Sequence, residues 1–265
     1  MSEQAPDFSP YRVAAVQMEP KLGAIAVNRD AIISKIGEAG RAGARFDLGS
    51  GLALKAAFGT GFKAPSFYAL ANPFVGNRDL RPEKSEGGEI GLAWTATGGD
   101  TASVALFHTR YKGLIDFIPG PPPRLENRDL VVSKGVSVAA AHAFSGAVTG
   151  TVQVQYARTE DDGANAQLLN RPRWRVNAAL DWRPSDTVRL ILRHAYVGDR
   201  DDYATPVGQQ TMRGYNLVSV EAAWTFAPRT TARIVVDNAL DDDHEDALGF
   251  AAPKAGVRLF LSRSF

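Results

Sequence analysis

The sequence predicts a mainly β protein: an antiparallel up-and-down transmembrane β-barrel portion of about ten strands, preceded by a short N-terminal strand-helix unit. Three observations support this prediction. Apolar residues alternate with polar or small ones along many segments, the connections between those segments alternate in length, and aromatic residues gather at the ends next to the short connections. The chain is 45% hydrophobic, yet it contains no run of about 18 apolar residues that could form a transmembrane helix.

The period-two alternation is clearest in segment 174–183, where Trp174 and Trp182 stand at the two ends of one apolar face. The intervening positions are polar or small, as expected for a strand with lipid on one side and water on the other. Many such segments have about ten residues, the length that a tilted strand needs to cross a bilayer. We expect strands near 50–59, 86–96, 101–111, 130–144, 147–158, 172–183, 187–197, 213–226, 230–239 and 256–265.

The connections between these segments alternate between short and long. The short ones lie at 97–100, 145–146, 184–186 and 227–229, and the long ones at 60–85, 112–129, 159–170, 198–213 and 239–255. Outer-membrane barrels have short turns on the periplasmic side and long loops outside, whereas a soluble meander has no reason to sort its loops by side. The alternation therefore predicts that all long connections lie on one rim.

Aromatic residues support the same sidedness, because Trp94, Phe144, Trp182 and Phe226 all stand at the short-turn ends of their segments, on the apolar face, where an interfacial girdle is expected. The chain also ends on an aromatic residue after an amphipathic segment, the usual ending of such barrels. Arg263 lies on this apolar face and would have to reach the headgroup layer. The residues assigned to the girdle and the barrel-closing strand are Trp94, Phe144, Trp182, Trp224, Phe226 and Phe265.

The front of the chain has a different pattern. A short apolar run predicts a strand at about 11–18, and helical spacing of apolar residues predicts a helix at about 28–42. Gly40 and Gly43 would end that helix. The sequence thus divides into residues 1–43, a strand-helix unit, and residues 44–265, the barrel portion.

Several kinds of chemistry are excluded or not indicated. With no cysteine, the chain has no disulfide, thiolate metal site or cysteine nucleophile, and the four histidines lack metal-ligand spacing. The net charge of +1 gives no reason to expect nucleic acid as a partner. The acidic run at 237–246 lacks the spacing of a calcium loop and reads as a solvated external loop. We expect no cofactor, no metal and no catalytic residue.

Several motifs give the barrel portion a family resemblance. The segments LALKAAFGTGFKAPSFYAL at 52–70, NRDLRPEKSEGGEIGL at 77–92, FHTRYKGLIDF at 107–117 and VVDNALDDDHEDALGF at 235–250 are similar to those of TonB-dependent outer-membrane receptors, the vitamin B12 and siderophore transporter branch above all. The resemblance implies a barrel of about 22 strands with a plug. It also implies a place in the outer membrane. The implied partners are outer-membrane lipid, the barrel assembly machinery and a small chelate, cobalamin or a ferric siderophore.

The chain departs from the pattern of that family. It shows no plug domain, no TonB-interaction segment, no export signal and none of roughly the first twelve strands, so we do not expect TonB as a partner. We expect a plugless fragment that cannot transport alone. Its sheet could curl into a small cylinder, pair with a second copy or stay open, and small residues such as Ala139, Ala141 and Ala179 favour an open or strained half-barrel.

A second resemblance covers the front segment. The sequence YRVAAVQMEPKLGAIAVNRDAIISKIGEAGRAGAR at 11–45 is similar to the opening of nitrilase-family carbon–nitrogen hydrolases, which work with a Glu, a Lys and a Cys nucleophile. This gives an alternative function, hydrolysis of an amide or nitrile, which the missing cysteine makes inactive. A spliced or recombined reading frame is the third alternative.

Overall fold

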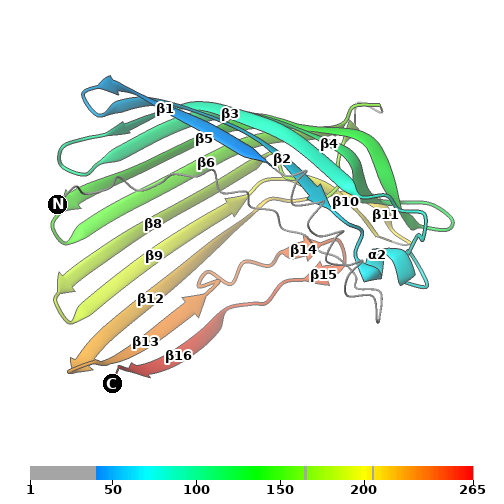
Figure 1. The fold of residues 1–265 in the computed structure, drawn as a ribbon. Coiled ribbons are helices and arrows are strands. Elements are labelled where there is room, and N and C mark those ends of the chain that lie inside the picture. Colours follow the sequence, from blue (N-terminus) through cyan, green and yellow to red (C-terminus); the bar gives the residue numbers. More distant parts are fainter. Residues whose placement is uncertain (1–39, 164–165, 205, 265) are drawn as a thin grey trace, which may run out of the picture.

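The computed structural model describes residues 40–264 except 164–165 and 205. Most of these residues form one long antiparallel sheet (Figure 1). Its strands are β1 (Arg41–Gly49), β2 (Leu52–Lys63), β3 (Glu83–Thr95), β4 (Thr101–Ile118), β5 (Arg124–Ser145), β6 (Val148–Asp161), β8 (Trp174–Ser185), β9 (Val188–Val197), β12 (Tyr215–Ala227), β13 (Thr230–Asp237) and β16 (Gly256–Arg263). The short β7 (Ala166–Gln167) pairs with the end of β6.

Each main strand pairs with the next main strand along the chain, so the sheet is an up-and-down meander. The short turns lie on one rim, at the left of Figure 1. The opposite rim carries α2 (Phe67–Ala71) and two small hairpins, β10 (Arg200–Ala204) with β11 (Gly208–Met212) and β14 (Glu245–Ala247) with β15 (Phe250–Ala251). The predicted fold class is therefore confirmed, and so is the sorting of the connections by length except between β4 and β5, whose connection is as short as the turn between β3 and β4.

The part of the chain that the structure describes has very little helix. Beyond Ala71 the described residues form no helix, as the alternation predicted. Across the described ranges, no helix is long and apolar enough to cross a membrane.

Strand β1 is an addition to the strands that the sequence predicted. It pairs with β2 from Arg41 to Gly49, so Arg41 and Ala42 are in a strand and the expected helix end at residue 42 is wrong. The proposed boundary at 43/44 falls inside β1. The alternation was weak here because Ala42 and Ala44 provide little apolar contrast with their neighbours. The expected strand at 11–18 and most of the expected helix at 28–42 lie outside the described residues.

Strands β4 and β5 are much longer than predicted. The expected long connection at 112–129 is mostly strand, and only residues 119–123 join the two strands. Gly113, with φ +69°, interrupts the pairing for one residue, after which Leu114 pairs with Arg128. The sequence signal ended early because strand residues beyond the membrane have no apolar face. At about 3.4 Å per residue, the 18 residues of β4 extend far past a bilayer core.

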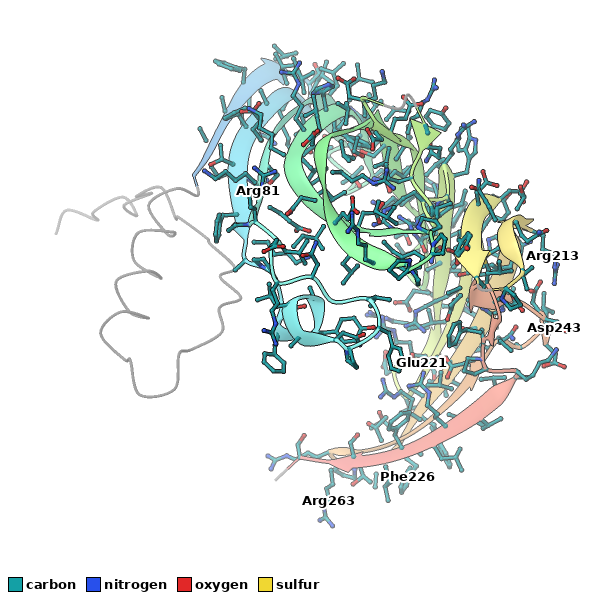
Figure 2. The ribbon with its side chains drawn as sticks, turned by 90° about the vertical axis from the view of Figure 1, so that its right-hand side faces the viewer. Arg81, Arg213, Glu221, Phe226, Asp243 and Arg263 are labelled. Atoms are coloured by element: carbon teal, nitrogen blue, oxygen red, sulfur yellow. The ribbon has the colours of Figure 1, made fainter. Side chains whose placement is uncertain are left out.

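The sheet is curved and open (Figure 2). Strands β1 and β16 are its two ends, and within the described residues they do not pair with each other. Figure 2 shows Glu221 on the inner side of the curve and Phe226 and Arg263 on the outer side. Few apolar side chains are fully buried, because the sheet has no second layer: Val131 is the only large one completely covered among the residues described. The strand order agrees with the expected open arrangement.

Candidate functional site

The strand register builds one continuous apolar outer face. Directly paired residues lie on the same side of a sheet, and pairs of branched apolar residues follow one another across six strands. One such row runs through Leu54, Leu92, Val104, Val138, Val154 and Val176. Many side chains of this face are exposed, up to 76% at Leu259. An exposed apolar surface this large marks a contact surface, and on the outside of a membrane barrel such a surface faces lipid.

The aromatic residues assigned to the girdle lie at the short-turn end of this outer face. Trp94, Phe144, Trp182, Trp224 and Phe226 are all substantially exposed. The Phe144 ring lies over Gly150 on the next strand, where a Cβ atom would come within 2.8 Å of it, and Trp224 contacts Phe226 with ring centroids 5.4 Å apart. Phe265 lies outside the described residues. The contact of these residues with a membrane interface stays a prediction.

A second aromatic pair marks the opposite end of the same face. Tyr156 and Trp174, on β6 and β8, have ring centroids 4.9 Å apart. Trp174 lies eight residues before Trp182 on β8, which is about 27 Å along a strand and about 21 Å in height at a tilt of about 40°. That height is close to the apolar band of about 25 Å that membrane barrels present to lipid.

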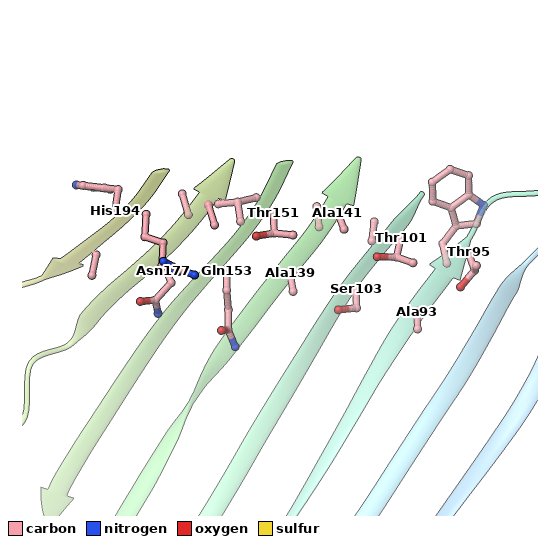
Figure 3. A pocket seen from close by; sticks show the side chains of 18 of the residues that line it. Ala93, Thr95, Thr101, Ser103, Ala139, Ala141, Thr151, Gln153, Asn177 and His194 are labelled. Atoms are coloured by element: carbon pink, nitrogen blue, oxygen red, sulfur yellow. The ribbon is translucent and has the colours of Figure 1, made fainter. Parts of the chain in front are cut away.

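The inner face of the sheet is polar and hollowed. A hollow of about 810 Å³ lies against strands β2 to β12, from the short-turn ends of β3 and β4 to the opposite ends of β9 and β12, and most of its lining residues alternate with the outward-facing ones. Figure 3 shows Gln153 and Asn177 among short side chains such as Ala93, Ser103 and Ala139. Hydroxyl, amide and methyl groups line the hollow together with Lys55, Arg193 and His194, and they can contact a polar ligand or another protein segment.

Charges on the inner face are paired across neighbouring strands. Glu221 on β12 accepts from Arg193 on β9 at 3.0 Å and lies 3.6 Å from Arg233 on β13. The guanidinium of Arg233 also lies over the Phe260 ring, 4.4 Å from its centroid. Similar cross-strand pairs join Arg189 to Asp181 and Arg258 to Asp237. These pairs place arginines beside carboxylates on the inner wall, with Glu221 shared by Arg193 and Arg233.

Three long connections are held together by Arg200, which is only 5% exposed. Its Nε donates to Asn170 Oδ1 at 2.8 Å, and its Nη2 donates to the carbonyl oxygens of Glu245 (2.6 Å) and Asp246 (3.2 Å). Its guanidinium also lies 5.3 Å from the Tyr215 ring centroid, and Tyr215 stacks on His244 at 4.1 Å. The sequence analysis did not find this cluster, because the partners are 30 to 46 residues from Arg200.

The connection between β2 and β3 is fastened to the β4–β5 hairpin. Asn127 accepts from the Arg81 amide at 2.8 Å and donates to the carbonyl oxygens of Arg81 (2.8 Å) and Gly113 (2.7 Å). Glu83, which is 7% exposed, accepts from the Ile115 amide at 2.8 Å and pairs with Lys63 at 3.2 Å. The rim of long connections is therefore an ordered structure rather than a set of independent loops.

The described residues offer no metal centre: none of their His, Asp and Glu side chains forms a group of three or more that could hold an ion. The acidic run at 237–246 is used instead in local bonds. Asp237 pairs with Arg258, Asp242 accepts from Asn238 Nδ2 through its carbonyl oxygen, and Asp243 pairs with Lys254 at 3.2 Å. Figure 2 places Arg213 and Asp243 at this rim.

The comparison with protein families decides the assignment of this two-faced sheet. The family described as "TonB dependent receptor-like, beta-barrel" matches residues 37–239, most of the chain. The chain belongs to this family. The match begins within the front segment and includes all of β1, so β1 is part of the receptor barrel. Members of this family are outer-membrane proteins, and the relatives described next are transporters and receptors, not enzymes.

Curated relatives include the vitamin B12 transporter BtuB of Vibrio cholerae serotype O1, which is 29% identical over 231 residues, 80% of this chain and 34% of that protein. The vitamin B12 transporter BtuB of Vibrio vulnificus (strain YJ016) is 26% identical over 198 residues, 72% of this chain and 31% of that protein. The chain thus spans about a third of the length of these relatives.

Solved structures agree on the fold. The ferric enterobactin receptor PfeA matches with a TM-score of 0.70 at 18% identity, over 86% of this chain and 40% of that one. The copper transporter OprC has a TM-score of 0.69 at 16% identity, over 86% and 39%. The siderophore receptor PirA from Acinetobacter baumannii has a TM-score of 0.68 at 18% identity. These comparisons give no support to the nitrilase-like interpretation of the front segment.

Proposed function

We propose that this chain forms part of the wall of an outer-membrane receptor that takes up a scarce chelate, either cobalamin or a ferric siderophore. The observation that carries the proposal is the two-faced sheet, with an apolar outer face bounded by aromatic residues and a polar, hollowed inner face. In this proposal the girdle residues Trp94, Phe144, Trp182, Trp224 and Phe226 lie at a membrane interface. The relatives named for vitamin B12 and for ferric enterobactin suggest the two ligand classes.

The inner wall would contact the chelate or the segment that fills the lumen through neutral polar groups. Gln153 and Asn177 are directly paired on β6 and β8 and offer two side-chain amides to the hollow. Such amides can donate to the carboxylate or hydroxyl groups of a chelate and accept from its amides. The rim of long connections would be the first part of the wall that a ligand from outside meets.

A chimera provides the sharpest test of this function. Residues 40–265 of this chain would replace the matching part of the Vibrio cholerae vitamin B12 transporter, expressed in a strain lacking its own receptor. We expect saturable uptake of labelled cyanocobalamin or of ferric enterobactin. Gln153→Ala with Asn177→Ala should weaken uptake, and the outward-facing control Val154→Ala should not. Correct surface expression without uptake of either chelate would contradict the proposal.

The chain by itself should not transport. Each unpaired backbone group at a sheet edge in lipid costs several kcal/mol, and β1 and β16 pair on one side only within the described sheet. Behind an export signal, the 265-residue chain should restore neither cobalamin nor ferric siderophore accumulation to a receptor-deficient strain. Saturable, TonB-dependent accumulation would show the opposite. The hydrolase alternative predicts turnover of amides or nitriles, which we do not expect from a chain without a thiol nucleophile.

A further inference from the structure

The outer face of four adjacent strands changes from apolar to basic at its long-connection end. The cations are Lys84 on β3, Arg110 and Lys112 on β4, Lys134 on β5 and Arg158 on β6. They are neighbours across the sheet, because Lys84 pairs with Lys112 and Lys134 pairs with Arg158. In β6, Arg158 comes two residues after Tyr156, the aromatic residue that marks this end of the apolar band.

The register places these cations outside the barrel wall. The pairing of β3 with β4 runs without a shift from Lys84 to Thr95, so every second residue of β3 shares one face. Lys84 therefore lies on the same face as Ile90, Leu92 and Trp94, the exposed apolar residues of β3. Every second residue of β4 shares a face in the same way, so Arg110 and Lys112 lie on the outer face with Leu106.

The positive charge of this patch is not neutralised by protein groups. Among the residues described, Lys84, Arg110, Lys112 and Lys134 form no ion pair, and only Arg158 is paired, with Glu160. The carboxylates nearby are Glu86, Glu160 and Asp129, the last of which lines the second hollow described below, so five cations face three anions. This contrasts with the inner face, where arginines pair across strands with Glu221, Asp181 and Asp237.

The patch is also hollowed and partly apolar. A hollow of about 270 Å³ is lined by Phe62, Lys84, Arg110 and Lys112. A second hollow of about 560 Å³ shares Phe62, Lys84 and Lys112, and its further lining includes Leu130, Arg81 and Asp129. On β8, β9 and β12 the corresponding outward positions hold uncharged residues such as Trp174, Tyr196 and Asn216. The basic patch is thus a local feature and not a general property of this rim.

We propose that this outward basic patch binds the phosphorylated headgroup of an anionic membrane lipid. Lipid headgroups are the anions that lie directly beyond the apolar band on the outside of a barrel, at the level of these cations. Phe62 and Leu130 would contact the start of the acyl region, and the cations would donate to phosphate oxygens. The inference rests on the membrane placement proposed above.

The test compares charge removal on the two faces. The full chain and its variants would be reconstituted in vesicles of equal parts phosphatidylglycerol and phosphatidylcholine and then extracted in mild detergent. Native mass spectrometry would count the lipid molecules that each protein retains. Wild type should retain phosphatidylglycerol in preference to phosphatidylcholine. The variant K84Q/R110Q/K112Q should lose that preference about a hundredfold, since each of the three exposed cations attracts anionic lipid and their contributions add. The inner-face control R41Q/K55Q/R175Q should keep it, and so should the conservative variant K84R/K112R.

Several outcomes would overturn the proposal. An unchanged preference in the outer-face variant, or an equal loss in the inner-face control, would show that the patch is not the site. Binding of inorganic phosphate to wild type without any preference among lipids would assign the patch to a free anion. Protection of the strands from protease shows whether the chain has inserted into the membrane. A wild-type chain that inserts but shows no lipid preference contradicts only this inference. A wild-type chain that does not insert contradicts the proposed function as well.

Discussion

The two rims of the sheet are built in different ways. At the short-turn rim, two to five residues join each pair of strands, and the bonds lie within a turn or reach an adjacent strand end, as from the Gly99 amide to the Ala96 carbonyl and from the Ala143 amide to Asp100. At the opposite rim the connections bond to one another: the Asn170 amide donates to Asp201, and the Leu248 amide donates to Asp202. Order at the first rim follows from short turns and the strands beside them, whereas order at the second depends on a few buried polar side chains.

Removal of Arg200 is the strongest way to test this difference. Arg200→Ala leaves the Asn170 side chain and two carbonyl oxygens without their buried donor, so the free energy of unfolding should fall by about 2–3 kcal/mol. Urea unfolding in lipid vesicles measures that change. Limited proteolysis should show faster cleavage in 162–173, 198–214 and 238–255 together.

The matched control at the other rim is Arg229→Ala, in the exposed turn between β12 and β13. It should change the free energy of unfolding by less than about 0.5 kcal/mol, as surface substitutions usually do. Faster cleavage of only one of the three long connections in Arg200→Ala would contradict the interlocked rim, because it would show that each connection is ordered by itself.

A smaller effect is expected where a single connection is fastened. Asn127→Ala removes two hydrogen bonds to Arg81 of the β2–β3 connection and one to Gly113 within the hairpin, and should lower the free energy of unfolding by about 1–2 kcal/mol. Proteolysis should increase in 64–82 and not at the other connections. Asn127→Asp keeps the oxygen that accepts from the Arg81 amide, so its free energy of unfolding should fall less than that of Asn127→Ala. An effect that spreads to 238–255 would show that the whole rim is one cooperative unit.

The outer face could be predicted from sequence, and the long-connection rim could not. Strand residues inside the membrane must alternate, because one side contacts lipid and the other water, so Trp174 to Trp182 gave a clear period of two. Beyond the membrane that constraint ends, which is why the extension of β4 to Ile118 was missed. In β1 the alternating positions are filled by Ala42 and Ala44, whose side chains are too small to give a clear alternation of apolar and polar residues.

The Arg200 cluster had no sequence signal at all. Its partners come from three connections, and the hydrogen bonds are with backbone carbonyl oxygens of Glu245 and Asp246, whose side chains are irrelevant to the contact. The outward basic patch could have been found from sequence, because Lys84, Arg110 and Lys112 occupy every-second-residue positions that continue the outward faces of β3 and β4. It was missed because Lys84 and Lys112 fall in segments 60–85 and 112–129, which were interpreted as loops.

The smallest expected effect concerns a local contact at the short-turn rim. Asp100, which ends the β3–β4 turn, accepts from the Ala143 amide at 3.0 Å and from His142 Nδ1 at 2.7 Å. The bond from the Ala143 amide, followed by that from His142, lowers the pKa of Asp100 below its ordinary value of 3.8. A carboxyl whose pKa is lowered by folding stabilises the folded state above pH 3.8, and that contribution is lost as the pH falls through the folded-state pKa.

Asp100→Asn keeps an oxygen for the Ala143 amide but removes the charge. At pH 7 the variant should therefore unfold at a slightly lower urea concentration than wild type, and the difference should vanish as the pH falls below 3.8. The control is Asp186→Asn, in the exposed turn between β8 and β9. Because the contact is local, proteolysis of the long connections should not change in either variant. A difference between Asp100→Asn and wild type that persists at pH 2, or that appears equally in Asp186→Asn, would contradict a specific role for the Asp100 charge.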